Sequence, residues 1–317
     1  MLYAPVVIPT LCRYEHFKAC LESLSLCTGA ENTDVYIGLD FPAKESHWEG
    51  YNKISKYLNE MTFNFKTLNV IKRERNYGVG PNGNYALLRK DIFERYDRMI
   101  FSEDDNIFSP NFLEYMNKGL EKFKEDDSVF AICGYKPFYP TKFENNTFSR
   151  RNDWFFAWGY GIWKDRQESI PDRNKYFKNN FSVRNLFLIK KEIGAELASC
   201  YFSAFSGFYR SWSDIPLCLY AFLEKKNFIY PSEKSLVRNM GWDQTGLHCD
   251  APRELCDKFS EQEISTQKEF EFIGTGYEFY QDNRKIAVKY SYARISEITF
   301  WKNICKGLVK YFLGIHK

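Results

Sequence analysis

The sequence predicts an α/β protein: a mixed sheet flanked by helices, followed by a C-terminal helical extension. Short apolar runs at residues 6–8, 34–39 and 70–71 are separated by segments with helical periodicity. Strands and helices that alternate in this way pack as a sheet with parallel neighbours and helices on its faces. The first predicted helix has its apolar residues on one side: Phe17, Cys20, Leu21 and Leu24.

Length and composition indicate a globular protein with an ample core. The 317 residues suffice for one large domain or two small ones. The 29 Phe, 22 Tyr and 7 Trp suit a sugar-binding cleft as well as a large core. The formal net charge of +3 is small for this length, and no segment resembles a nucleic-acid-binding module. We therefore expect no nucleic-acid partner.

The N-terminus and the cysteines indicate a cytoplasmic location. An apolar strand begins at Val6, and no basic region or cleavage site precedes it. No run approaches the roughly 18 apolar residues that span a bilayer. The nine cysteines lack CxxC spacing, which fits free thiols in a reducing compartment.

The strongest chemical signal is an acidic triplet that follows a short apolar run at residues 99–101. Its members are Glu103, Asp104 and Asp105. Ligands of open α/β sheets bind beyond the carboxyl ends of the strands, where these acids fall. Alternation along a strand predicts Glu103 and Asp105 on one face and Asp104 on the other. Hard oxygen ligands of this kind suit Mg²⁺ or Mn²⁺.

The residues after the triplet predict a helix, with Ser109 as its N-cap and Pro110 in its first turn. The order strand, Glu-Asp-Asp, short apolar link, Ser-Pro, Phe-Leu-Glu-Tyr resembles the metal-binding segment of GT-A glycosyltransferases. It is most similar to the N-acetylglucosaminyltransferase I-like group and to bacterial transferases that build surface polysaccharide, such as lipopolysaccharide or capsule. The resemblance implies a Rossmann-like domain that binds a nucleoside-diphosphate-sugar. It also implies that Asp105 binds Mn²⁺ or Mg²⁺, that Asp104 contacts the nucleotide sugar and that Glu103 supports them.

Polar residues follow each of the first two predicted strands. Thr10 and Arg13 lie in the turn after the first strand, where a cation can clamp a diphosphate or stack beneath a base. Arg13 can equally well face water. The resemblance places nucleotide-binding residues at this turn, and it places Asp40, at the tip of the second strand, near the base.

Residues 78–83 match GxGxxG, but they are not read as a dinucleotide-binding loop. That fingerprint needs glycines directly after a strand, usually the first one. Here residues 72–77 intervene, and two strand–helix units come first. The glycines instead predict a loop before a helix that carries Tyr85, Leu88 and Ile92. In the similar transferases this region borders the donor site, so Asn76 and Asn84 are candidate donor contacts.

The aromatic stretch 154–163 contains two glycines, which weaken a strand and often mark a close approach of backbone or ligand. The local sequence fits a segment of the hydrophobic core and the lining of a pocket equally well. Related transferases carry a similar Trp-Gly segment beside the donor sugar, which favours Trp158 and Gly159 as pocket residues.

Asp214 begins a predicted helix with Pro216 in its first turn. An acid there is often only a partner of the helix dipole. The resemblance implies instead that Asp214 is the general base, and a helix N-terminus would keep it ionised. His248 ends a segment, 234–248, that resembles the loop covering the diphosphate in the bacterial enzymes. It is either structural or a contact of metal or phosphate.

We divide the chain into a catalytic domain (1–250), a cap or extension (251–292) and a basic amphipathic helix (293–317). The apolar residues of that helix recur at helical spacing: Phe300, Ile304, Leu308, Tyr311 and Ile315. Lysines 302, 306 and 310 lie elsewhere on it. Such a helix packs on its own domain or lies on an anionic membrane surface, peripheral to the inner face of the cytoplasmic membrane, where a lipid-linked acceptor would be found.

The sequence therefore predicts a metal-dependent, inverting glycosyltransferase that moves a sugar to a glycan hydroxyl during bacterial surface-polysaccharide synthesis. Two alternatives remain. A sugar-nucleotide pyrophosphorylase favours a Gly-rich loop after the first strand, and residues 9–13 contain no glycine. A non-catalytic saccharide-binding protein would explain the aromatic residues, but not the acids Asp105 and Asp214.

Overall fold

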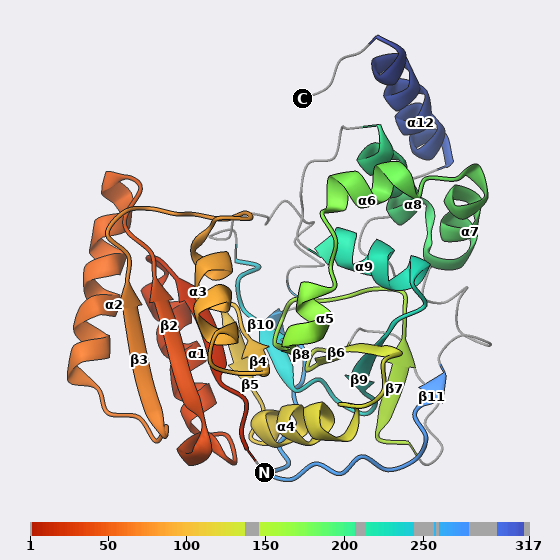
Figure 1. The fold of residues 1–317 in the computed structure, drawn as a ribbon. Coiled ribbons are helices and arrows are strands. Elements are labelled where there is room, and N and C mark those ends of the chain that lie inside the picture. Colours follow the sequence, from red (N-terminus) through yellow and green to blue (C-terminus); the bar gives the residue numbers. More distant parts are fainter. Residues whose placement is uncertain are drawn as a thin grey trace.

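The computed structural model describes residues 2–136, 146–206, 214–243, 257, 260–278 and 297–313. These residues form an α/β fold around a mixed sheet (Figure 1). The strands are β1 (Val6–Thr10), β2 (Asp34–Leu39), β3 (Thr67–Lys72), β4 (Arg98–Phe101), β5 (Asn106–Phe108), β6 (Val129–Cys133), β7 (Phe148–Arg151), β8 (Tyr160–Trp163), β9 (Asn227–Pro231), β10 (Val237–Asn239) and β11 (Tyr277–Glu278). The α-helices are α1 (Tyr14–Ser25), α2 (Trp48–Glu60), α3 (Asn84–Phe93), α4 (Phe112–Lys122), α5 (Lys164–Glu168), α6 (Arg173–Asn179), α7 (Val183–Ile193), α8 (Ala195–Phe205), α9 (Asp214–Leu223) and α12 (Glu297–Phe312). The predicted α/β class, with its mixed sheet and C-terminal helix, is confirmed.

The main sheet has the strand order β11-β7-β9-β6-β8-β4-β1-β2-β3. Strands β4, β1, β2 and β3 are parallel to one another, and β8 runs antiparallel between β4 and β6. Strands β5 and β10 form a separate antiparallel pair. Because β1, β2 and β4 are parallel, their carboxyl ends meet at one edge of the sheet.

Strands β1, β2 and β4 are buried on both faces, as expected where helices cover the two sides of a sheet, whereas the edge strand β3 is partly exposed. In β1, Val6 and Ile8 belong to the core cluster that includes α1, whereas Val7 belongs to the cluster on the opposite face. The four apolar residues predicted for the first helix are the ones that α1 buries. The predicted strands at 34–39 and 70–71 lie within β2 and β3.

The start of α4 corrects a prediction. Ser109 was expected to cap this helix, but the cap is Asn111 and α4 begins at Phe112. The backbone N–H of Ser109 donates to the carbonyl of Leu236 at 2.9 Å, which extends the β5–β10 pairing. Ser109 is therefore held in that pairing, and the helix starts two residues later than predicted.

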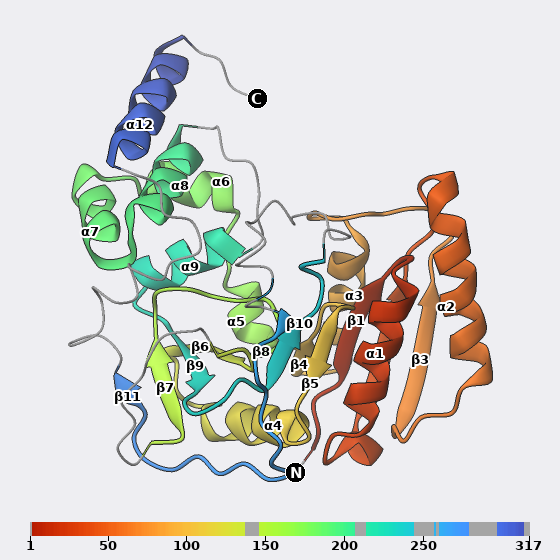
Figure 2. The ribbon, with the colours of Figure 1, turned by 180° about the vertical axis from the view of Figure 1, so that it is seen from behind.

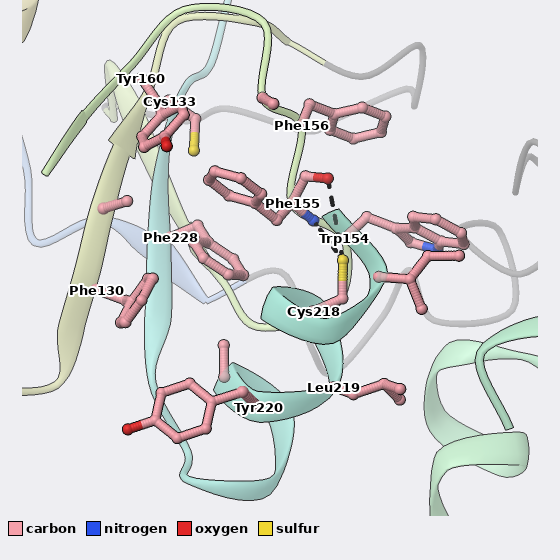
Figure 3. Packing of buried hydrophobic residues seen from close by; sticks show 14 of the residues in the cluster. Phe130, Cys133, Trp154, Phe155, Phe156, Tyr160, Cys218, Leu219, Tyr220 and Phe228 are labelled. Carbon is pink, nitrogen blue, oxygen red and sulfur yellow. Dashed lines mark hydrogen bonds between the residues drawn. The ribbon is translucent and has the colours of Figure 1, made fainter. Parts of the chain in front are cut away.

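Most of the aromatic stretch 154–163 belongs to the core. Trp154, Phe155 and Phe156 are buried, and the stretch ends in the buried strand β8. Figure 3 shows Phe155 beside Cys218 of α9, whose sulfur accepts a hydrogen bond from the Phe155 N–H at 3.1 Å. This contact fixes α9 against the sheet.

Helices α6 to α9 and α12 gather above the half of the sheet that is far from β3 in the views of Figures 1 and 2. Helix α12 packs on α8. No helix in the described part of the chain is both long enough and apolar enough to cross a membrane. The cysteines in the described part are free thiols, as predicted.

Candidate active site

The candidate site lies at the edge where β1, β2 and β4 end. Thr10 is the last residue of β1, Asp40 follows β2, and the acidic triplet follows β4. These are the carboxyl ends of neighbouring parallel strands, the position at which open α/β sheets bind ligands. The fold thus brings together residues that are up to 95 positions apart in sequence.

The acidic triplet corrects the predicted alternation. Strand β4 ends at Phe101, and residues 104 and 105 form a turn. Period-two alternation therefore does not apply to the acids. Asp104 and Asp105 instead converge on one guanidinium, that of Arg13.

Arg13, in the turn between β1 and α1, is an ion-pair partner of both aspartates. Its Nη2 contacts Asp104 Oδ1, and its Nη1 lies 2.7 Å from Asp105 Oδ2. The Arg13 side chain is 25% exposed, whereas those of Asp104 and Asp105 are 9% and 7% exposed. The hydroxyl of Thr10 donates to the remaining oxygen of Asp104 at 2.8 Å. The Arg13 guanidinium is thus the most accessible group of this cluster. It does not simply face water, because it also pairs with two carboxylates.

Asn239 completes the cluster, and sequence reasoning did not single it out. Its Nδ2 donates to Asp105 Oδ1 at 2.7 Å and lies 3.3 Å from Glu103 Oε2. The β5–β10 ladder positions it, because Asn239 pairs with Asn106. The sequence marked the segment 234–248 by its resemblance to a loop that covers the diphosphate, but gave no sign of this pairing.

Gly241 lets the same segment approach the acids closely. A Cβ at this position would lie 2.0 Å from Asp105 Oδ2 and 3.0 Å from Arg13 Nη1. Its backbone N–H donates to Asn239 Oδ1 at 3.0 Å, which orients the amide group toward Asp105. A side chain here would displace the ion pair.

Burial and like charge determine the protonation of the acids. Burial raises the pKa of Glu103 well above its ordinary value, and the negative charges of Asp105 and Asp214 raise it further. Burial also raises the pKa of Asp105, while Arg13 and Asn239 act in the opposite direction. For Arg13, burial alone would lower the pKa, but the two aspartates reverse this effect and raise it. Burial and the neighbouring negative charges therefore favour the neutral form of Glu103.

The described residues, as arranged, do not fit a metal ion bound directly by Asp105. All four carboxylate oxygens of Asp104 and Asp105 already accept from protein donors: Thr10, Arg13 and Asn239. Among the described residues, no group of three His, Cys, Asp or Glu side chains is arranged to hold a metal ion. Direct coordination by Asp105 would require Arg13 or Asn239 to move. His248, the other predicted ligand, lies outside the described residues.

Asp40 organises the glycine loop. Its carboxylate accepts hydrogen bonds from the backbone N–H groups of Tyr77, at 2.9 Å, and Gly78, at 2.7 Å. Asn76 donates to the carbonyl of Phe41 at 2.6 Å and to Asp40 at 3.3 Å. The loop lies between β3 and α3, as predicted. Contact of Asp40 or Asn76 with a nucleotide stays a prediction.

Asn84 is engaged within the fold. Its Nδ2 donates to the carbonyl of Gly38 at 2.6 Å, and its Oδ1 accepts from Arg73 at 2.9 Å. These bonds join α3 to the end of β2. Asn84 therefore supports the loop, and its contact with a donor also stays a prediction.

Trp158 and Gly159 lie where the segment from Lys234 to Asp243 crosses the aromatic stretch. The Trp158 ring centroid is 5.8 Å from that of Trp242, and Trp158 is partly buried. Gly159 has φ +69°, and a Cβ there would lie 2.8 Å from Val237 Cγ2. Close packing and a left-handed backbone thus account for the glycine, while Trp158 keeps an accessible part.

Asp214 is the first residue of α9, as predicted, and Pro216 lies in its first turn. The negative charge of Asp214 raises the pKa of Glu103, so Asp214 lies within electrostatic range of the triplet. Cys218, one turn further along, anchors the helix on Phe155. The fold thus brings a carboxylate from a distant helix toward the Arg13 cluster.

Comparisons with known proteins give similarity at low identity. No protein-family model and no curated protein sequence matches the chain. A solved S. aureus TarS fragment, 1–349, aligns over 98% of this chain and 80% of its own, with 12% identity and a TM-score of 0.41. The UDP-GlcNAc complex of that fragment aligns over 99% and 73%, with 14% identity and a TM-score of 0.41.

The chain spans a smaller share of two longer structures. It aligns over 45% of its length with 24% of the S. aureus TarS structure, at 16% identity and a TM-score of 0.30. It aligns over 42% of its length with 23% of the bifunctional glycosyltransferase WbbM, at 15% identity and a TM-score of 0.24. These values carry no conclusion about activity.

The arrangement has a clear chemical capacity. The N–H groups of Arg13 that do not pair with Asp104 and Asp105 can bind a phosphate oxygen, and the two buried carboxylates hold the guanidinium in place. A carboxylate near it can accept a proton from a hydroxyl. The site therefore suits transfer of a group that departs with a phosphate.

Proposed function

We propose that the protein is a glycosyltransferase that moves a sugar from a nucleoside-diphosphate-sugar to a hydroxyl of a glycan. The observation that carries the proposal is the position of Arg13. Its guanidinium is the accessible charge above Asp104 and Asp105, at the carboxyl edge of the parallel strands. An anionic ligand that enters this edge meets a cation whose orientation the two carboxylates fix.

The donor diphosphate binds Arg13 in this proposal. The loop organised by Asp40 and the Asn76 side chain border the nucleotide, and Trp158 borders the transferred sugar. Preorganised positive charge at the diphosphate stabilises the negative charge that develops as the nucleotide leaves. The Glu-Asp-Asp motif and the geometry of the edge support the same class of reaction.

Asp214 serves as the general base. The acceptor hydroxyl gives its proton to the Asp214 carboxylate, and its oxygen forms a bond to the anomeric carbon. The bond from that carbon to the diphosphate oxygen breaks, and its electron pair leaves with the nucleotide. Direct attack of this kind inverts the anomeric configuration. Glu103, with its raised pKa, limits the negative charge that accumulates beside Asp214.

The motif implies Mn²⁺ or Mg²⁺ at Asp105, whereas the side chains as arranged give the neutralising role to Arg13. No step of the proposed reaction passes through a metal ion. Assays with Mn²⁺, with Mg²⁺ and with chelator distinguish the two possibilities. The acceptor is proposed to be a growing surface glycan, either free or linked to a lipid.

The test measures nucleotide release and glycan product with a panel of nucleoside-diphosphate-sugars. UDP-GlcNAc is a convenient first donor. We expect Asp214→Asn to reduce turnover about 10²- to 10⁴-fold and to leave donor binding nearly unchanged, because positioned base catalysis contributes on that scale. Asp172→Asn is the matched control, since Asp172 also stands at a helix N-terminus, that of α6. Full activity of Asp214→Asn would show that Asp214 is not the general base.

Two other outcomes would replace the proposal. Formation of sugar nucleotide and pyrophosphate from a nucleoside triphosphate and a sugar phosphate would identify a pyrophosphorylase. Glycan binding without turnover of any donor would identify a saccharide-binding protein.

A further inference from the structure

Helix α12 uses part of its predicted apolar face for packing on its own domain. Phe300 and Ile304 are buried, and α12 contacts α8. A Cβ at Gly307 would lie 2.5 Å from the Phe202 ring of α8, so the two helices approach closely there. This face is therefore occupied by the protein itself.

A second apolar face of α12 remains exposed. Trp301, Leu308 and Val309 are 47%, 38% and 57% exposed. At 3.6 residues per turn, Trp301 and Leu308 lie about a quarter of a turn around the helix from Phe300 and Ile304, and Val309 lies almost half a turn from them. The helix thus has two apolar faces, of which only one is used by the fold.

Helix α7 extends the exposed face. The Phe187 ring centroid lies 6.3 Å from that of Trp301, and Phe187 is 47% exposed. Val183 and Leu188 of α7 are also exposed. Leu188 instead lines a groove with residues of α6 and α9. We name the combined surface the α7–α12 face; it consists of Val183, Phe187, Trp301, Leu308 and Val309.

Basic residues border the α7–α12 face. They are the exposed Arg184 and Lys191 of α7 and the exposed Lys302 and Lys306 of α12. The nearby acid Glu192 is mostly covered and lies 3.4 Å from Lys191. An apolar strip with aromatic residues and a basic border is typical of helices that lie in the interface of an anionic bilayer.

We propose that the α7–α12 face binds the surface of an anionic lipid bilayer. The charges favour this partner over a second copy of the chain. A two-fold contact through this face would bring the same basic residues of both copies together, whereas lipid phosphates neutralise them. The inference rests on this face alone and does not depend on the proposed transferase activity.

The experiment is flotation of the full chain with vesicles of phosphatidylcholine, with and without 30 mol% phosphatidylglycerol. We expect binding to the anionic vesicles that weakens as salt is added, because surface charge attraction is screened. The apolar variant is Phe187→Ser with Trp301→Ser, and its matched control is Leu26→Ser with Met61→Ser, two exposed apolar residues elsewhere. The charge variant is Lys302→Glu with Lys306→Glu, and its control is Lys53→Glu with Lys56→Glu on α2.

Each basic residue near an anionic surface strengthens binding about fivefold, so the charge variant should bind more than about tenfold more weakly. The apolar variant should also lose binding, and both controls should bind like the wild type. Circular dichroism establishes that each variant is folded. The proposal is overturned if the wild type does not bind anionic vesicles, if it binds neutral ones equally, or if the variants bind like their controls. If the wild type self-associates and the variant with Phe187→Ser and Trp301→Ser does not, a second copy of the chain occupies the face. This result would also overturn the proposal.

Discussion

Nη1 of Arg13 lies 2.7 Å from Oδ2 of Asp105, the residue that the sequence resemblance assigns to a metal ion. One guanidinium and one divalent cation cannot both occupy this position. Binding of a metal ion at Asp105 therefore competes with the Arg13–Asp105 ion pair. The competition can be measured through the effect of metal on the unfolding temperature.

We predict that Mn²⁺ alone does not raise the unfolding temperature of the wild-type protein, but does raise that of Arg13→Ala. Removal of the guanidinium frees one oxygen each of Asp104 and Asp105, and a bound ligand stabilises the folded state. Without metal, Arg13→Ala should be less stable by about 2 kcal/mol, because two mostly buried carboxylates lose a charged partner. Thermal unfolding with Mn²⁺ and with chelator measures both effects. A saturable Mn²⁺ effect on the wild type that Asp105→Asn abolishes would show that Asp105 binds metal directly.

Asn239→Ala should destabilise the protein by about 1–3 kcal/mol, because a buried carboxylate oxygen of Asp105 loses its donor. It should also weaken donor binding, since the orientation of Asp105 supports that of Arg13. Urea unfolding and calorimetry with nucleoside diphosphates measure the two effects. Asn32→Ala, at an exposed position, is the control. An effect on stability with unchanged donor affinity would separate Asn239 from the site.

Gly241→Ala should abolish donor binding and leave most of the fold intact. The added Cβ would lie 2.0 Å from Asp105 Oδ2, so the ion pair with Arg13 has to move. Gly80→Ala is an informative comparison, since a Cβ at Gly80 meets nothing within 4 Å, although its φ of +112° adds backbone strain. Calorimetry measures binding, and circular dichroism measures folding. Normal donor affinity in Gly241→Ala would contradict the assigned geometry.

Stability should fall as the pH rises from about 4.3 to about 7 because of Glu196 on α8. Burial raises the pKa of Glu196 to about 7. In this window the folded state holds a proton that the unfolded state has lost, so the free energy of unfolding decreases with pH. The total loss is on the order of 3 kcal/mol. Glu196→Gln should flatten this part of the profile in urea unfolding, whereas Glu60→Gln, at an exposed position on α2, should not. If the free energy of unfolding of Glu196→Gln still decreases with pH at the same slope, a group other than Glu196 causes the loss of stability.

The sequence predicted the elements whose residues are buried on both sides. The strand at 34–39 and the apolar side of α1 were predicted residue by residue, because continuous apolar runs and helical spacing reflect local burial. The turn at residues 104 and 105 was not predicted, since it depends on where β4 stops. The sequence singled out the acids, but Arg13, the partner that Asp104 and Asp105 share, emerges only when the ends of β1 and β4 are adjacent.

Contacts between distant segments account for the remaining differences. Asn239 meets Asp105 through the β5–β10 ladder, and Ser109 is drawn into the same pairing. Neither contact has a local signal. The C-terminal helix was predicted to be amphipathic, but only its packing on α8 shows which of its apolar residues remain exposed.

The β5–β10 ladder also has a consequence for the order of folding. It joins Asp105 to Asn239 across 134 residues, whereas β1, β2 and β3 are linked by much shorter connections. Closing a long loop costs more chain entropy, so contacts of this span form late. The N-terminal strands can assemble before the acid cluster has its amide partner. We therefore expect binding competence to appear late in folding, and the time course of nucleoside diphosphate binding during refolding measures this.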